Sequence, residues 1–80
     1  MYREMFVKKL EIGNRVEVSS KGGWKNDFFG TVVDGPEPVE TLKGTENYYW
    51  VEFDEPQEDI NGPDQYSKAQ ILSCYINEAT

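Results

Sequence analysis

Hydrophobic and polar residues alternate along several short stretches of the chain. In residues 14–19 two valines alternate with charged or polar residues, and a period of two is typical of a half-buried strand. β-Branched residues in 28–34, alternation in 48–54 and an apolar run in 71–76 predict three more strands. The apolar positions of these strands predict one shared core: Val16, Val18, Val32, Val51, Phe53 and Ile71.

Glycine and proline residues mark the connections between these strands. Asp34-Gly35-Pro36 predicts a turn, because glycine accepts a positive φ and proline fixes its own φ. Pro36 and Pro38 lack the N–H that a strand donates to its neighbour, so residues 35–47 are expected to form a long connection between strands 2 and 3. Residues 55–64 contain two prolines and a glycine and are expected to form a polar loop.

The length and the strand pattern together predict an all-β domain. A chain of 80 residues is the size of one domain, and closing a sheet into a barrel removes the edge strands that a small β protein must otherwise protect. We therefore expect one small barrel of about five short strands, with residues 1–11 as an extension, 12–76 as the barrel and 77–80 as a tail. Within the extension, Met5, Phe6 and Leu10 fit either a weak helical stripe or a short strand.

The strand at 48–54 has two distinct faces. If Val51 and Phe53 point into the core, Tyr49 does so too, because side chains alternate between the faces of a strand. The opposite arrangement would bury two carboxylates without partners, which is costly. Tyr48 and Trp50 are therefore expected on the outer face, together with Glu52 and Asp54.

The order of these segments resembles SH3-like small β-barrels. Gly13-Asn14-Arg15-Val16-Glu17-Val18 opens the pattern, Phe29-Gly30-Thr31-Val32-Val33 follows, then Val51-Glu52-Phe53-Asp54 and finally Tyr66-Ser67-Lys68-Ala69-Gln70-Ile71. The chain is similar to the opening of KOW-type domains and to the barrels of photosystem I subunit IV and the ferredoxin–thioredoxin reductase variable chain. The resemblance covers residues 12–76 and implies that the 19–28 and 55–64 loops lie close together, with Trp24 at the centre of the first, as in SH3-like surfaces where loop aromatics build a peptide groove.

Few residues of this chain fit catalytic or metal-binding chemistry. There is no histidine and one cysteine, Cys74, which is expected to be a buried apolar residue in a reducing compartment. Usual nucleophile–base pairs are therefore missing, and we expect neither enzyme activity nor a cofactor. Asp59-Ile60-Asn61-Gly62 resembles the start of an EF-hand loop, but Lys68 stands where that loop needs its glutamate. Weak cation binding by Glu55, Glu58, Asp59 and Asp64 is the remaining metal hypothesis.

Charge is distributed unevenly along the chain. The net charge is −7, with a small positive excess in residues 1–33 and eleven acidic against two basic residues in 34–80. Duplex DNA carries about one negative charge per 1.7 Å, so a domain this acidic is not expected to bind nucleic acid. No apolar run approaches the roughly 20 residues that span a bilayer, so no membrane association is expected, and the N-terminus does not read as a signal peptide.

An aromatic and acidic patch is the candidate binding site. Trp and Tyr are enriched in interface hot spots, and carboxylates at the rim of an interface steer a basic partner. The sequence therefore predicts a small cytoplasmic interaction module or accessory subunit that binds a basic protein or peptide. Its partner-binding residues would be Trp24, Tyr48, Trp50, Glu52, Asp54, Glu55, Glu58, Asp59 and Tyr66.

Several alternatives remain open at this point. Trp24 and Trp50 also fit as lids on the chain's own core, because a short domain has few large side chains. The acidic face is also compatible with a mimic of nucleic acid that occupies a basic groove. A third hypothesis is a KOW-like nucleic-acid binder that uses Arg15, Lys21 and Lys25, for which strong salt-sensitive binding would be the sign.

Overall fold

The computed structural model describes residues 10–79, which form five strands and two 3₁₀ turns. The strands are β1 (Arg15–Val18), β2 (Phe28–Thr41), β3 (Gly44–Glu58), β4 (Gln65–Leu72) and β5 (Ile76–Glu78). The 3₁₀ turns are η1 (Ser20–Gly22) and η2 (Ser73–Tyr75). There is no α-helix in this part of the chain, and the prediction of an all-β domain is confirmed.

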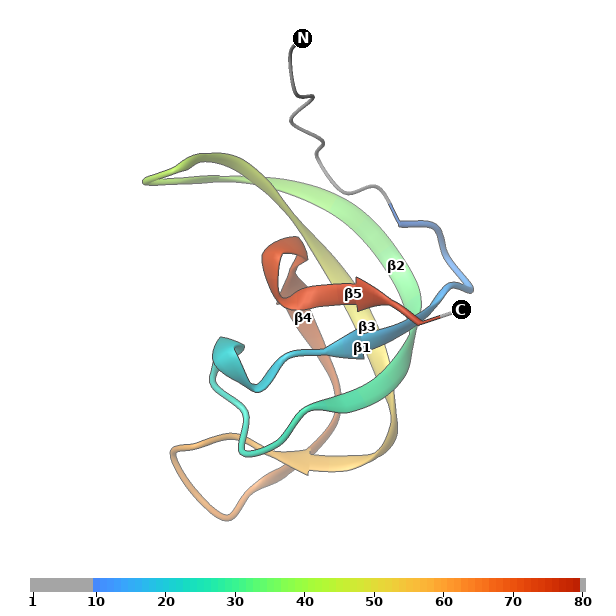
Figure 1. Ribbon diagram of the computed structural model, residues 1–80, viewed down its shortest axis with the longest axis vertical. Coiled ribbons are helices and arrows are strands. Elements are labelled where there is room, and N and C mark those ends of the chain that lie inside the picture. The colour runs from blue at the N-terminus through green and yellow to red at the C-terminus, as the bar shows by residue number, and fades with distance from the viewer. Residues whose placement is uncertain (1–9, 80) are drawn as a thin grey trace, which may run out of the picture.

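All five strands belong to one antiparallel sheet with the order β4-β3-β2-β1-β5. The long strands β2 and β3 curve along the length of the molecule, and β1 and β5 lie across them (Figure 1). β4 and β5 are the two edges and do not pair with each other among residues 10–79. The sheet is therefore open, and the expected full closure into a barrel is not found.

The long connection expected at residues 35–47 is instead a continuous β-hairpin. β2 runs through Pro36 and Pro38, and β2 and β3 stay paired up to Thr41 and Gly44. Pairing with β1 ends at Thr31, so the prolines lie where β2 has a strand neighbour on one side only. A missing N–H on the open side breaks no ladder bond, which is why the prolines did not end the strand.

Two further boundaries differ from the sequence-based expectation. Glu55–Glu58 belong to β3, so the loop predicted at 55–64 is confined to residues 59–64. A register shift between Glu52 and Gln57 marks the irregularity at which β3 accommodates Pro56. The strand predicted at 71–76 is interrupted by η2, and the expected tail begins with β5, which pairs with β1.

The core contains all six predicted residues. Val16, Val18, Val32, Val51, Phe53 and Ile71 are buried, together with Leu10, Phe28, Tyr49 and Ile76. Leu10 lies in the predicted extension yet is fully buried, and its backbone N–H donates to the Tyr49 hydroxyl at 3.0 Å. Tyr49 thus joins the core with its polar end hydrogen-bonded, as a buried phenol requires. The expectations for Met5 and Phe6 fall outside the described residues.

The prediction that Cys74 is buried is wrong. Cys74 is exposed, and its neighbour Ser73 is buried instead. The 3₁₀ turn η2 replaces the extended backbone that the alternation assumed, so the inward position falls on a different residue. The Ser73 hydroxyl donates to the Glu46 carboxylate at 3.2 Å, which supplies the partner that a buried hydroxyl needs.

Candidate functional site

The two loops that the resemblance placed close together do meet. The backbone N–H of Lys25 donates to the carbonyl of Glu58 at 3.1 Å, and that of Ile60 donates to the carbonyl of Gly23 at 3.0 Å. Between these bonds, Trp24 and Asp59 form an isolated antiparallel bridge. The segment after β1 is thereby fixed against the β3–β4 turn, and the position of Trp24 is set by backbone hydrogen bonds.

The Trp24 side chain covers one end of the core. Its ring makes edge-to-face contacts with Phe28, Phe53 and Tyr66, at centroid distances of 5.4, 5.3 and 5.9 Å. Each such contact is worth roughly 0.5–1.5 kcal/mol beyond area burial. Trp24 and Tyr66 therefore have a structural role, as the alternative interpretation of Trp24 expected. Trp24 is only partly buried, so a part of its surface is still accessible.

That accessible part of Trp24 lines a groove of about 220 Å³. Tyr48 from β3 and Tyr75 from η2 line the same groove, which is completed by Gly22, Gln70, Ile71 and Leu72. We call these seven residues the aromatic groove. Gly22 lies against the Tyr75 ring, and a Cβ at this position would be 3.1 Å from two ring atoms. The close approach of η1 to η2 therefore depends on a residue without a side chain.

Tyr48 and Trp50 share the outer face of β3 but have different surroundings. Tyr48 is opposite Leu72 of β4 and lines the aromatic groove, whereas Trp50 is opposite Gln70 and lies outside it. The Lys68 ammonium lies 5.6 Å from the centroid of the Trp50 ring, a cation–π geometry. Trp50 is half-buried and already has a cationic neighbour from its own chain.

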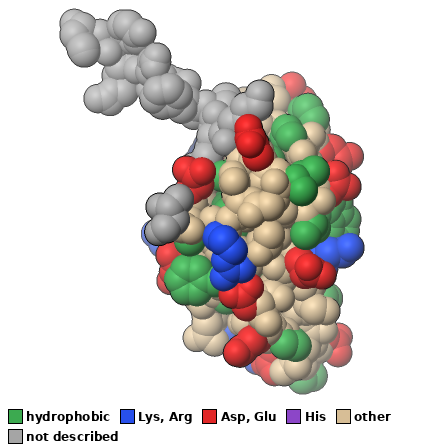
Figure 2. All heavy atoms as spheres, turned by 90° about the vertical axis from the view of Figure 1, so that its right-hand side faces the viewer, with side chains coloured by type: hydrophobic (Ala, Val, Ile, Leu, Met, Phe, Trp, Pro, Cys, Tyr) green, Lys and Arg blue, Asp and Glu red, His purple; other side chains and the backbone are tan. Residues whose placement is uncertain are grey.

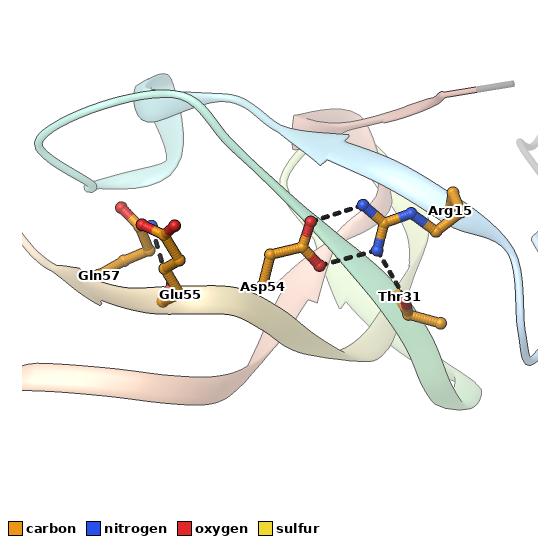
Figure 3. Close-up of polar contacts among 5 residues, drawn as sticks. All are labelled: Arg15, Thr31, Asp54, Glu55 and Gln57. Carbon is orange, nitrogen blue, oxygen red and sulfur yellow. Dashed lines mark hydrogen bonds and ion pairs between the residues drawn. The ribbon is translucent and has the colours of Figure 1, made fainter.

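Asp54 is bound by a basic residue of the same chain. The Arg15 guanidinium donates to both Asp54 carboxylate oxygens, at 2.7 and 2.6 Å, and also to the Thr31 hydroxyl at 2.9 Å (Figure 3). These hydrogen bonds lower the pKa of Asp54 and raise the pKa of Arg15. The contact spans β1, β2 and β3 on the outer face, so it links three strands and neutralises one predicted rim carboxylate.

Two other predicted acids are also engaged within the chain. Glu58 accepts a hydrogen bond from the Lys25 ammonium at 2.5 Å and another from Gln65, and its pKa is lowered chiefly by the contact with Lys25. Asp59 accepts from the backbone N–H of Asn61 at 3.0 Å and so supports the β3–β4 turn. These two carboxylates help to hold the loops that position Trp24.

The predicted site residues do not form one site. Trp24 and Tyr48 line the aromatic groove, and Glu58 lines a polar hollow with Lys25. Asp54 and Glu55 line a third hollow of about 270 Å³ with Phe28, Phe29 and Gln57. Trp50 and Glu52 lie on the outer face and line none of these three hollows, and Glu52 is opposite Lys68. On the face in Figure 2, acidic side chains are spread among hydrophobic ones, with few basic groups between them.

Sequence reasoning missed Tyr75, because the run Leu-Ser-Cys-Tyr-Ile was interpreted as one strand. Interrupting such a strand by a 3₁₀ turn changes which residues point outward. The serine in this run was the available signal, since serine favours turns and helix starts over strand interiors. η2 carries Tyr75 to the aromatic groove.

Comparisons with protein-family models, with curated proteins and with solved structures give no match. The site therefore has to be interpreted from its own geometry. Within residues 10–79, no helix has the length and apolar character to cross a membrane. The same residues contain no group of three acidic or cysteine side chains arranged to hold a metal ion.

Proposed function

We propose that this protein is a non-enzymatic interaction module that binds a peptide segment of a basic protein in the aromatic groove. The observation that carries the proposal is the combination of three accessible aromatic side chains, Trp24, Tyr48 and Tyr75, in one groove on a chain of net charge −7. Aromatic-lined grooves are a recurring device for holding extended peptides. The acidic surface would speed the encounter with a basic partner. A cytoplasmic location is part of the same proposal.

Acidic side chains near the groove support the choice of a basic partner. Glu37 accepts a hydrogen bond from Gln70, a groove residue, at 2.6 Å. Glu46 accepts a hydrogen bond from Ser73, which stands two positions before the groove residue Tyr75. Asp59 pairs with Trp24 through the backbone bridge. The basic residues in the adjoining segments are Lys21, Lys25 and Lys68, and Lys25 is already paired with Glu58.

The alternatives are less well supported by the contacts of the charged residues. Arg15 and Lys25, two of the three bases of the nucleic-acid-binding hypothesis, are engaged in ion pairs with Asp54 and Glu58. Those same ion pairs neutralise two carboxylates that a nucleic-acid mimic would present. We therefore favour the peptide-binding function over both alternatives.

An open, SH3-like arrangement of the five strands is the fold that we propose for the sheet. The support, besides the resemblance of residues 12–76, is that β5 follows a short 3₁₀ turn and returns to pair with β1. The meeting of the segment after β1 with the β3–β4 turn also supports it. Folds of this kind host many functions, so the proposed function depends on the groove and not on the fold.

The test is a selection of peptides from a random displayed library by the purified chain. We expect selected peptides to be enriched in Lys and Arg, and Tyr48→Ala to weaken their binding by about tenfold or more, as hot-spot truncations do. Phe29→Ala is the matched control, because Phe29 is exposed and lines a different hollow. Raising the salt concentration should weaken binding, since surface charges are screened. Selected peptides without basic residues, or equal losses in both variants, would contradict the proposal.

A further inference from the structure

The free edge of β4 runs beside the aromatic groove. β4 is an edge strand whose neighbour is β3, and three groove residues, Gln70, Ile71 and Leu72, come from it. Among residues 10–79, no backbone group of β4 has a hydrogen bond to an element other than β3. An exposed edge of this kind is a template for pairing with another strand.

The pairing register shows which backbone groups point toward this edge. Val32 exchanges hydrogen bonds with Gly13 and Asn14, on the side away from β3. Its partner Val51 must therefore direct its own N–H and C=O toward β4, where it pairs with Ala69. Because hydrogen-bonded and non-hydrogen-bonded pairs alternate in antiparallel sheets, the residues on either side of Ala69 direct their groups outward. Lys68, Gln70 and Leu72 are these outward residues.

The part of β2 that extends beyond β1 also has an unpaired side, and the chain protects that side but not the edge of β4. The open side of β2 carries Pro36 and Pro38, and prolines are a common means of blocking an edge. β4 has no proline. Its one charged residue, Lys68, lies over the Trp50 ring on the outer face, so its ammonium is held on that face of the sheet.

We propose that the basic peptide binds as an added strand on β4, with hydrogen bonds to the outward backbone groups of Gln70 and Leu72. This inference rests on the proposed function and specifies its ligand as an extended segment in which apolar and basic side chains alternate. Alternate side chains of an added strand point to opposite faces. One set would pack on the aromatic groove, and the other would lie near the carboxylates. A second copy of this chain is a poorer occupant, because each copy carries −7.

The test uses two probe peptides as long as β4. In one, Lys alternates with Val; in the other, the same lysines are separated by Pro, which lacks the N–H needed for strand pairing. We expect the Lys/Val peptide to bind about tenfold or more tightly than the Lys/Pro peptide. We expect the amides of Gln70 and Leu72 to exchange rapidly in the free chain and more slowly when the Lys/Val peptide is bound.

Two variants separate the backbone from the side chain. Gln70→Ala removes a groove side chain and keeps the outward N–H, whereas Gln70→Pro removes both, so we expect the proline variant to bind about tenfold or more weakly than the alanine variant. If Gln70→Pro does not fold, the exchange measurement on the parent chain decides. Equal binding of the two peptides, or binding without protection of these amides, would overturn the inference of an added strand. The effect of Tyr48→Ala on binding would still show independently whether the groove is the binding site. Protection that appears without peptide as the protein concentration rises would also overturn it, in favour of self-pairing. If Tyr48→Ala binds the peptide as tightly as the parent chain does, the result counts instead against the proposed function.

Discussion

At the scale of single residues, Gly30 shows how closely two strands of this sheet approach. A Cβ at Gly30 would be 2.5 Å from the Glu52 carbonyl oxygen and 2.8 Å from a Val51 methyl carbon. Gly30→Ala must therefore displace β3 from β2, and we expect it to lower the free energy of unfolding by about 2 kcal/mol. The melting temperature would fall by about 10 °C. Gly62→Ala is the control, because a Cβ there meets nothing within 4 Å, and similar melting of the two variants would contradict this explanation.

The contact between Arg15 and Asp54 makes a prediction about pH. The hydrogen bonds from Arg15 lower the pKa of Asp54 in the folded state. The contact therefore stabilises the fold above the pKa of an aspartate in the unfolded chain, about 4, and this stabilisation is lost as the pH falls through the lower pKa of the folded state. The melting temperatures of the parent and of Asp54→Asn should therefore differ most near neutral pH and converge in acid. Asp64→Asn removes the same charge from an exposed turn residue. If it shows the same pH-dependent difference, net charge and not this contact is responsible.

At the scale of elements, the β2–β3 hairpin depends on its turn. Leu42 and Lys43 form the tip, and Gly44 has a φ of +118°, a conformation that costs other residues roughly 1–2 kcal/mol. We expect Gly44→Ala to destabilise the hairpin by about 1 kcal/mol although a Cβ there has free space. Amide exchange should quicken in residues 37–48 and stay unchanged in β1. Uniform acceleration throughout the sheet would show that the hairpin does not open separately.

The elements also show how far the sequence determines the structure. Alternation predicted the core positions of β1 and β3 correctly, because one face of each strand is buried. A shift of the pairing register by one residue would move the hydrophobic side chains of that face into solvent. Alternation could not predict that Pro36 and Pro38 lie within β2, since proline tolerance depends on which side of a strand has a neighbour. It also failed at η2, where a single 3₁₀ turn exchanges the positions of Ser73 and Cys74 relative to the core.

The surroundings of the predicted site residues depend on contacts between distant parts of the chain. Sequence reasoning selected Trp24 and Tyr48, and both line the aromatic groove. It grouped them with acids of β3 and of the β3–β4 turn. The ion pairs of Asp54 with Arg15 and of Glu58 with Lys25 are tertiary contacts that no local pattern reveals. The assignment of Trp50 to the partner-binding residues likewise stays a prediction.

At the scale of the whole molecule, our proposal places binding at the aromatic groove and not on the outer face around Trp50. The chain has two tryptophans, so their indole N–H groups give two separate reporters in a ¹⁵N-labelled sample. Trp24 lines the groove and Trp50 does not. When the peptide selected in the display experiment is added, we expect a large shift of the Trp24 indole signal and a smaller one for Trp50. A shift confined to Trp50, with Trp24 unchanged, would contradict the proposal.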